Sequence, residues 1–208
     1  MPVIAIVNPK GGVGKSTVAT NLAGYFACTS NATMLGDLDH QQSSRDWLSQ
    51  RPTGAAPIYP WEMTHNRARP PAGVTHVVID TPAQMPVDRL KALFKGVDKI
   101  LVPVQPSMFD IRATGGFLRE LRAAIADDRR FFESVGVVGV RVDPRTRSAD
   151  ELSRFVSGLG LPVAGYLRDT QSYVHLAAHG LTVFDNVNSR QIEADRETWR
   201  PLVDWVLH

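Results

Sequence analysis

A glycine-rich loop near the start of the chain, KGGVGKST (Lys10–Thr17), constrains the fold more than any other stretch. It follows an apolar run, Val3–Val7, and opens a helical stretch that continues from Ser16 to about Cys28. Glycines let backbone N–H groups approach an anion without a Cβ in the way, and a helix N-terminus adds unpaired N–H groups and a favourable dipole. A loop of this composition between a strand and a helix predicts a phosphate-binding site in an α/β protein.

Each residue of the loop has an expected role at a bound nucleotide. Lys15 is expected to neutralise the β- and γ-phosphates, the Ser16 hydroxyl to ligate Mg²⁺, and Thr17 to reach the α-phosphate. The predicted nucleotide-binding residues of the loop are Gly11, Gly12, Val13, Gly14, Lys15, Ser16 and Thr17. The general pattern G-x-x-x-x-G-K-[ST] asks for glycine where this chain has Pro9, and the chain carries a second lysine, Lys10.

Apolar runs of strand length recur along the chain and alternate with helical stretches such as Phe109–Asp127. The predicted strands are Val3–Val7, a strand ending at Asp37, His76–Asp80, Lys99–Val104, Val135–Val142 and Leu161–Leu167, with one further short strand inside Arg51–Val74. Because the runs lack polar alternation, they fit strands that are buried on both faces. The order predicts an α/β fold, a mainly parallel twisted sheet with helices on both faces, and 208 residues with 43% hydrophobic content suit a single domain over 1–208.

The loop resembles the deviant Walker A motif of the ParA/MinD superfamily of P-loop ATPases, and the block from Leu167 to Asp185 resembles small partition ATPases of that superfamily. The resemblance implies ATP and Mg²⁺ as cofactors, ATP hydrolysis, and a homodimer in the ATP state. In the family the extra lysine reaches the partner's ATP, so this role falls to Lys10. Offered in trans, its charge would act as an arginine finger does, beside Lys15 in the partner's own site.

Two carboxylates follow predicted strands in segments that resemble the family's switch motifs. DLDHQ resembles the switch I segment D-x-D-P-Q, which implies that Asp39 lies near the attacking water and the Mg²⁺ shell; His40 stands where the family usually has proline. DTPAQ resembles the switch II segment D-T-P-A-G. Asp80 then matches the Walker B aspartate, which holds Mg²⁺ through water, and Gln84 takes the glycine position. The implied catalytic residues are therefore Lys10, Lys15 and Asp39, and the implied metal site comprises Ser16, Asp39 and Asp80.

Two later segments carry weaker resemblances. VPVQPSMFD resembles the family's P-V-x-P-S-x-x-D segment, and its matching residues are Pro103, Pro106, Ser107 and Asp110. Either a proline-shaped turn between strand and helix or a direct role in the dimer fits this segment. Where relatives often carry an Asn-Arg pair whose asparagine faces adenine, this chain has Val140-Arg141. The resemblance places Arg141 among the nucleotide-binding residues, while the asparagine is missing.

The output of such an ATPase is less constrained by the sequence. DNA partition or cargo positioning would need non-specific DNA binding by the ATP dimer and a ParB-like or cargo-adaptor partner that stimulates hydrolysis. A formal net charge of +2 does not by itself indicate a nucleic-acid binder. The candidate DNA-binding residues are Arg119, Arg122, Arg145, Arg147 and Arg154. Solvated helix faces with acidic neighbours explain these arginines equally well.

Two other outputs belong to the same fold. A MinD-like protein is recruited to the membrane through a basic amphipathic C-terminal helix, whereas the apolar residues near Trp199 and Trp205 have few cations beside them, which favours a terminal helix packed on the core. A metabolic ligase of the dethiobiotin synthetase type would usually lack the second lysine. No helix-turn-helix precedes the strand at Val3, so we expect no sequence-specific operator binding. We expect a cytoplasmic, nucleoid-associated protein with no stable membrane anchor.

Overall fold

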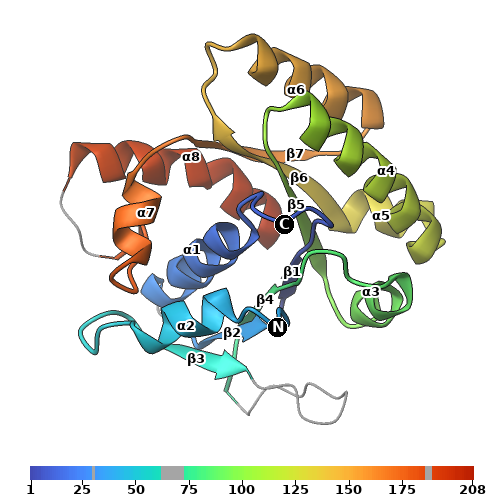
Figure 1. Ribbon diagram of the computed structural model, residues 1–208. Coiled ribbons are helices and arrows are strands. Elements are labelled where there is room, and N and C mark those ends of the chain that lie inside the picture. The colour runs from blue at the N-terminus through green and yellow to red at the C-terminus, as the bar shows by residue number, and fades with distance from the viewer. Residues whose placement is uncertain (30, 62–72, 186–188) are drawn as a thin grey trace.

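A sheet of seven parallel strands organises the protein (Figure 1). The computed structural model describes residues 1–29, 31–61, 73–185 and 189–208. The strands are β1 (Val3–Ile6), β2 (Thr33–Asp37), β3 (Ile58–Trp61), β4 (His76–Asp80), β5 (Lys99–Val104), β6 (Val135–Val142) and β7 (Val163–Arg168). Their order is β3-β2-β4-β1-β5-β6-β7, and each neighbouring pair is parallel. The predicted α/β class with a parallel sheet is confirmed.

Helices cover both faces of this sheet, as predicted. They are α1 (Lys15–Cys28), α2 (Ser43–Ser49), α3 (Val87–Phe94), α4 (Met108–Ile125), α5 (Asp128–Ser134), α6 (Arg147–Leu159), α7 (Ser172–Ala177) and α8 (Arg190–Leu207). Figure 1 shows α3 to α6 on one side of the sheet and α1, α2, α7 and α8 on the other. The side chains along β1 and of Val7, the residue after it, show this arrangement. Ile4 and Ile6 join the core beneath α1 and α8, whereas Ala5 and Val7 join the core beneath α3 and α4.

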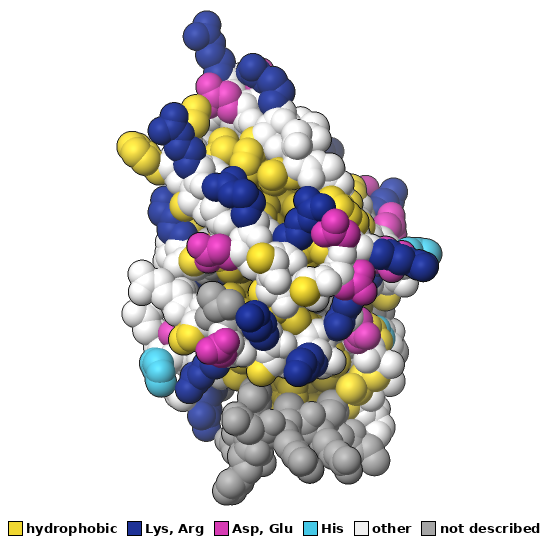
Figure 2. Space-filling model, turned by 90° about the vertical axis from the view of Figure 1, so that its right-hand side faces the viewer, with side chains coloured by type: hydrophobic (Ala, Val, Ile, Leu, Met, Phe, Trp, Pro, Cys, Tyr) yellow, Lys and Arg dark blue, Asp and Glu magenta, His cyan; other side chains and the backbone are white. Residues whose placement is uncertain are grey.

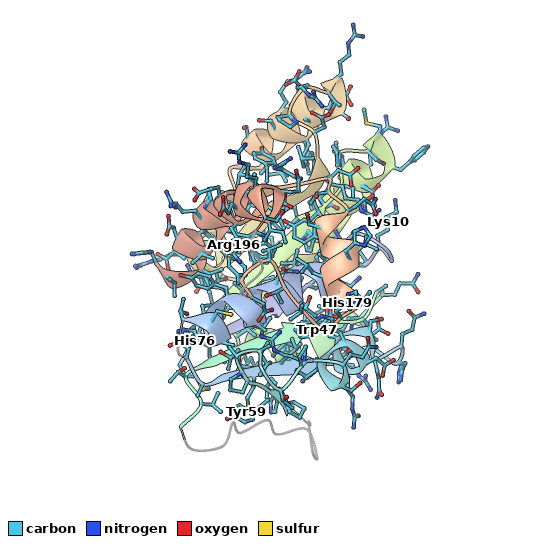
Figure 3. All side chains as sticks on the ribbon, turned by 90° about the vertical axis from the view of Figure 1, so that its left-hand side faces the viewer. Lys10, Trp47, Tyr59, His76, His179 and Arg196 are labelled. Atoms are coloured by element: carbon cyan, nitrogen blue, oxygen red, sulfur yellow. The ribbon has the colours of Figure 1, made fainter. Side chains whose placement is uncertain are left out.

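The loops that follow the strands meet at one edge of the sheet, because all strands run in the same direction. We call this the carboxyl edge. Lys10, which follows β1, and His76, the first residue of β4, lie on opposite sides of the molecule in Figure 3, so the two ends of the strands are well separated. Ligands of open α/β sheets bind beyond the carboxyl ends of the strands. The residues after β1, β2, β4, β5 and β6 therefore form the place to look for a site.

The C-terminal helix α8 packs on the sheet, as the sequence predicted. Trp199 and Leu202 are fully buried, and the Trp199 indole donates a hydrogen bond of 3.0 Å to the Tyr173 hydroxyl. Leu202 lies so close to Gly165 of β7 that a Cβ there would be 3.3 Å from the leucine Cβ. Within the described part of the chain, no helix combines the length and the apolar character needed to cross a membrane.

Most differences from the predicted elements lie at their ends. The first strand ends at Ile6, one residue early, and the last strand is β7, two residues later at its start than predicted. The long helix after β5 ends at Ile125, and Asp128 begins a separate helix, α5, whose N-terminus is capped by Asp127. Inside Arg51–Val74 the expected short strand is β3 at the sheet edge, while residues 62–72 of this stretch lie outside the described residues.

Candidate functional site

The loop between β1 and α1 is held in place by side chains from neighbouring strands and helices. The Asn8 amide donates to the Pro103 carbonyl oxygen (2.7 Å) and to the Thr114 hydroxyl (3.2 Å), and its oxygen accepts the Lys10 backbone N–H. The Gln105 amide donates to the Gly12 carbonyl oxygen at 2.9 Å. Asn8 and Gln105 thus fix the start and the middle of the loop. Neither residue was predicted from the sequence, although Asn8 stands two residues before the glycine loop and Gln105 lies within the VPVQPSMFD segment.

Gly14 shows why this loop needs glycine. Its φ angle is 92°, in the left-handed region that side chains rarely adopt, and a Cβ at this position would lie 3.0 Å from the Val140 side chain. Val140 is buried in the core, where it packs beneath the loop. The missing asparagine of the Asn-Arg pair is therefore replaced by a packing residue. Arg141 is exposed with a φ of 56°, at an irregularity of β6, and its predicted contact with nucleotide stays a prediction.

Lys15 lies inside the loop. Lys15 is only 8% exposed, and its ammonium group donates a 3.0 Å hydrogen bond to the Lys10 carbonyl oxygen. Burial lowers the pKa of Lys15, and the nearby carboxylates of Asp80 and Asp39 act in the opposite direction. An ammonium group has three N–H donors, and the described residues accept one of them, at the Lys10 carbonyl oxygen, which leaves two for an anion. The predicted role of Lys15 at the phosphates stays a prediction.

Lys10 leaves the loop in another direction. Its ammonium group forms an ion pair of 2.6 Å with Asp110 Oδ1 in the first turn of α4; the side chain of Lys10 is 42% exposed and that of Asp110 is 6% exposed. Ser107 caps the same helix by accepting the Asp110 backbone N–H. The segment therefore forms a capped strand-to-helix turn, and its aspartate also contacts the second lysine. The two lysines therefore lie in different environments: the ammonium group of Lys15 is inside the loop, and that of Lys10 is at its edge.

The segment after β2 is organised by Asp37. Its Oδ1 accepts the Asp39 backbone N–H at 2.9 Å, and its Oδ2 accepts the backbone N–H groups of Ser44 at 2.8 Å and of Arg45 at 3.1 Å. Asp37 therefore binds the N-terminal end of α2, where a carboxylate also complements the helix dipole. Asp39 is half-buried and accepts the Gln41 backbone N–H at 3.1 Å.

Asp80 is a buried carboxylate at the end of β4. It is 2% exposed, and its Oδ2 accepts a 2.6 Å hydrogen bond from the Ser44 hydroxyl. Burial raises the pKa of Asp80 to about 6, while the nearby hydroxyls of Ser44 and Ser16 act to lower it. Its Oδ1 has no hydrogen-bond partner among the described residues. A buried carboxylate oxygen without a partner beside a serine hydroxyl is a donor set that suits a hard cation such as Mg²⁺.

No group of three or more His, Cys, Asp or Glu side chains gathers as a metal site in the part of the chain that the structure describes. Mg²⁺ does not require such a cage, because it usually binds through one or two carboxylates together with substrate phosphates and water. The oxygens of Asp80 and Ser16 fit that mode. The predicted contribution of Asp39 to the metal site stays a prediction.

Gln84 follows Asp80 at the position where the switch II motif has glycine. Its φ angle is 60°, so the backbone keeps a left-handed conformation with a side chain present. A residue other than glycine is uncommon in this conformation and stores strain, which is typical of functional loops. The side chain of Gln84 is exposed, so it points away from the core of the protein.

The candidate DNA-binding arginines, Arg119, Arg122, Arg145, Arg147 and Arg154, are all exposed. Arg122 is paired with Asp128 at 2.7 Å and Arg145 with Asp143 at 2.8 Å. On the face shown in Figure 2, the basic side chains are interspersed with acidic and hydrophobic ones and form no continuous patch. The assignment of these arginines to DNA stays a prediction.

The geometry agrees with comparisons with known proteins. Residues 4–183 match the family described as the CobQ/CobB/MinD/ParA nucleotide binding domain. The maintenance of carboxysome distribution protein A of Gloeobacter kilaueensis is 30% identical over 201 residues, covering 93% of this chain and 89% of that protein. The chromosome-partitioning ATPase Soj of Thermus thermophilus is 26% identical over 182 residues, covering 72% of this chain and 73% of that protein. A plasmid partition protein of Borrelia burgdorferi bound to AMPPNP has a TM-score of 0.73 at 16% identity, over 99% of this chain and 98% of that one, a likeness of fold alone.

Proposed function

Because the chain belongs to the CobQ/CobB/MinD/ParA family of nucleotide-binding domains, we propose that it is a ParA-type ATPase that positions DNA or a protein assembly. ATP with Mg²⁺ binds at the carboxyl edge, two subunits close over two nucleotides, and hydrolysis separates them. Two relatives support a positioning role, since one is a carboxysome distribution protein and the other a chromosome-partitioning ATPase. The Borrelia partition protein supports ATP, because its structure contains the ATP analogue AMPPNP.

The different directions of the two lysines carry this proposal. Lys15 is buried inside the loop and can reach a phosphate of its own site, whereas Lys10 lies at the rim, half-exposed and paired with Asp110. A second ammonium group at the rim adds little charge neutralisation to a phosphate site that already contains Lys15. Offered to a second copy of the chain, the same ammonium group neutralises charge that develops on the transferred phosphoryl group.

The remaining residues of the site have complementary roles. Backbone N–H groups of the loop and of the N-terminus of α1 bind the phosphates. The oxygens of Ser16 and Asp80 would hold Mg²⁺, which would neutralise charge on the phosphates. Asp39 orients the attacking water from the segment after β2. Arg141 extends the nucleotide site from the end of β6.

The test compares the two lysines in the full-length chain. With a non-hydrolysable ATP analogue and Mg²⁺, the wild-type protein sediments as a dimer. Lys15→Ala loses nucleotide affinity roughly a hundredfold, because it removes a charged hydrogen-bond donor from a buried site. Lys10→Ala keeps the affinity and stays a monomer. Equal loss of affinity in both variants, or a wild-type protein that stays monomeric with the analogue, contradicts the proposal.

The same dimer then decides between the outputs. We expect it to bind DNA of random sequence more tightly with the ATP analogue than with ADP, with an affinity that falls steeply as salt is raised. Binding to liposomes instead would favour a MinD-like protein. Formation of a ligation product without DNA or a protein partner would favour a metabolic ligase. The stimulating partner, a ParB-like protein or a cargo adaptor, is sought only if DNA binding is found.

A further inference from the structure

Ser44, the second residue of α2, connects the two carboxylates at the ends of β2 and β4. Its backbone N–H donates to Asp37 Oδ2 at 2.8 Å, and its hydroxyl donates to Asp80 Oδ2 at 2.6 Å. Asp37 and Asp80 are register partners on adjacent parallel strands. Ser44 is 0% exposed, so water does not compete for either contact.

The position of Ser44 is fixed from both sides. Asp37 holds the start of α2 through two backbone N–H groups, and Trp47, one turn later on α2, is buried in the hydrophobic core. The hydroxyl of Ser44 therefore meets Asp80 from a packed helix and not from a free loop. The neighbouring Ser43 is exposed. Of the two serines, Ser44 is the one for which the described structure shows a hydrogen bond to the Asp80 carboxylate.

The contact leaves the two oxygens of Asp80 in different situations. Oδ2 accepts the Ser44 hydroxyl, whereas Oδ1 is buried without a hydrogen-bond partner among the residues that the structure describes. Groups that orient a carboxylate in this way commonly set the metal affinity of the site, because they prevent the ligand from rotating away.

We propose that Ser44 is a positioning residue that orients Asp80, so that Oδ1 is the oxygen available to the hydration shell of Mg²⁺. The inference rests on the proposed function, since Mg²⁺ is needed only if the site binds a nucleotide. Ser44 also connects the segment after β2 to the metal ligand at the end of β4. A displacement of α2 would then change the orientation of Asp80 directly.

The experiment measures binding of a fluorescent, non-hydrolysable ATP analogue to the full-length chain as Mg²⁺ is increased. Ser44→Ala is expected to raise the Mg²⁺ concentration for half-saturation roughly tenfold. Its affinity for the analogue in EDTA stays at the wild-type value, because the loop contacts are intact. Ser43→Ala, the matched control, shows wild-type Mg²⁺ dependence. Ser44→Cys, a weaker donor of similar size, falls between Ser44→Ala and wild type.

A double-mutant cycle with Asp80→Ala distinguishes positioning from a general structural role. If Ser44 acts through Asp80, Ser44→Ala causes no further change in Mg²⁺ dependence in the Asp80→Ala background. A further change there, or a Ser44→Ala variant with wild-type Mg²⁺ dependence, overturns the inference and leaves the proposed function intact. A wild-type protein that does not bind the analogue, or binds it equally with and without Mg²⁺, contradicts the proposed function itself. Thermal unfolding of each variant in EDTA verifies that it is folded.

Discussion

Two buried aspartates, Asp185 and Asp80, are treated very differently by the fold. Asp185 lies in the segment between α7 and α8, where Arg51 donates to both of its oxygens at 2.8 and 3.1 Å, and the backbone N–H and the hydroxyl of Thr182 donate to Oδ2. The side chains of Arg51 and Asp185 are each 5% exposed. Asp80 is as deeply buried, yet one of its oxygens has no partner within the described structure.

The difference is the one expected between a structural ion pair and a carboxylate that binds a ligand, which is the role proposed for Asp80. A buried ion with a full set of partners fastens segments that are distant in the sequence, here residues 51 and 185. A buried carboxylate with an incomplete set is costly to the folded protein and is kept where a ligand completes it. Asp185 and Asp80 have similar exposed fractions, and the number of their hydrogen-bond partners is what differs.

Removing the fully paired cation should have the largest effect. Arg51→Ala leaves Asp185 buried without its counter-ion, so we expect the free energy of unfolding to fall by about 3–5 kcal/mol. Urea denaturation measures this loss. Arg129→Ala, which breaks an exposed pair with Glu133, is the control and should leave the free energy of unfolding almost unchanged. A small loss in Arg51→Ala with a large loss of nucleotide affinity would mean that this pair is functional as well.

Neutralising the incompletely paired carboxylate should have the opposite sign. The pKa of Asp80 is raised by burial from 3.8 to about 6, so the folded protein holds this proton more tightly than the unfolded chain and loses stability as pH rises between these values. Without Mg²⁺ or nucleotide, Asp80→Asn should therefore raise the free energy of unfolding at about pH 7.5 by about 1–3 kcal/mol.

Urea denaturation in EDTA at several pH values tests this, and the difference from wild type should shrink as pH is lowered through about 6 toward 4. Asp143→Asn is the control, because hydrogen bonds from Arg145 lower the pKa of Asp143 to about 2. Neutralising the Asp143 carboxylate should therefore not raise the free energy of unfolding. A gain that is independent of pH would show that the ionised carboxylate is not its cause.

The smallest expected effect concerns an ion pair that is neither fully buried nor fully exposed. Lys10 and Asp110 form an ion pair with one exposed and one buried partner. If Lys10 acts on a second subunit, Asp110 competes for it within the same chain. Asp110→Asn should then tighten the dimer formed with the ATP analogue roughly tenfold, or about 1.4 kcal/mol shared by two subunits, with unchanged nucleotide affinity. Sedimentation measures the dimer, and Asp128→Asn, which frees the exposed Arg122, is the control. A weaker dimer would mean that Asp110 helps to hold the interface.

The sheet and the residues at its carboxyl edge were predictable because their signals are local. Continuous apolar runs indicated the buried strands, and the glycine loop and the carboxylates stand directly after them in the sequence. Lys15 and Asp80 consequently lie near each other as predicted, close enough for Asp80 to affect the pKa of Lys15. The roles of Asp39 and Arg141, the DNA-binding arginines and the single domain over 1–208 stay predictions.

The pairing of side chains was not predictable, because it joins residues that are far apart in the chain. Ser44 and Asp80 are separated by 36 positions, Asn8 and Pro103 by 95, and Arg51 and Asp185 by 134. No periodicity or motif in a single sequence encodes such a pair. The sequence likewise shows where the arginines occur in the chain. It does not show that Arg122 and Arg145 form ion pairs with carboxylates.

The hydrogen bond between the Lys15 ammonium group and the Lys10 carbonyl oxygen should affect how fast an anion binds and which anions can bind. The side chain has already lost its rotational freedom and much of its water in the folded chain, so an arriving phosphate meets a pre-organised cation. Little rearrangement separates encounter from binding. The same pre-organised loop should bind small oxyanions such as sulfate at high concentration, which would make them competitors of the nucleotide.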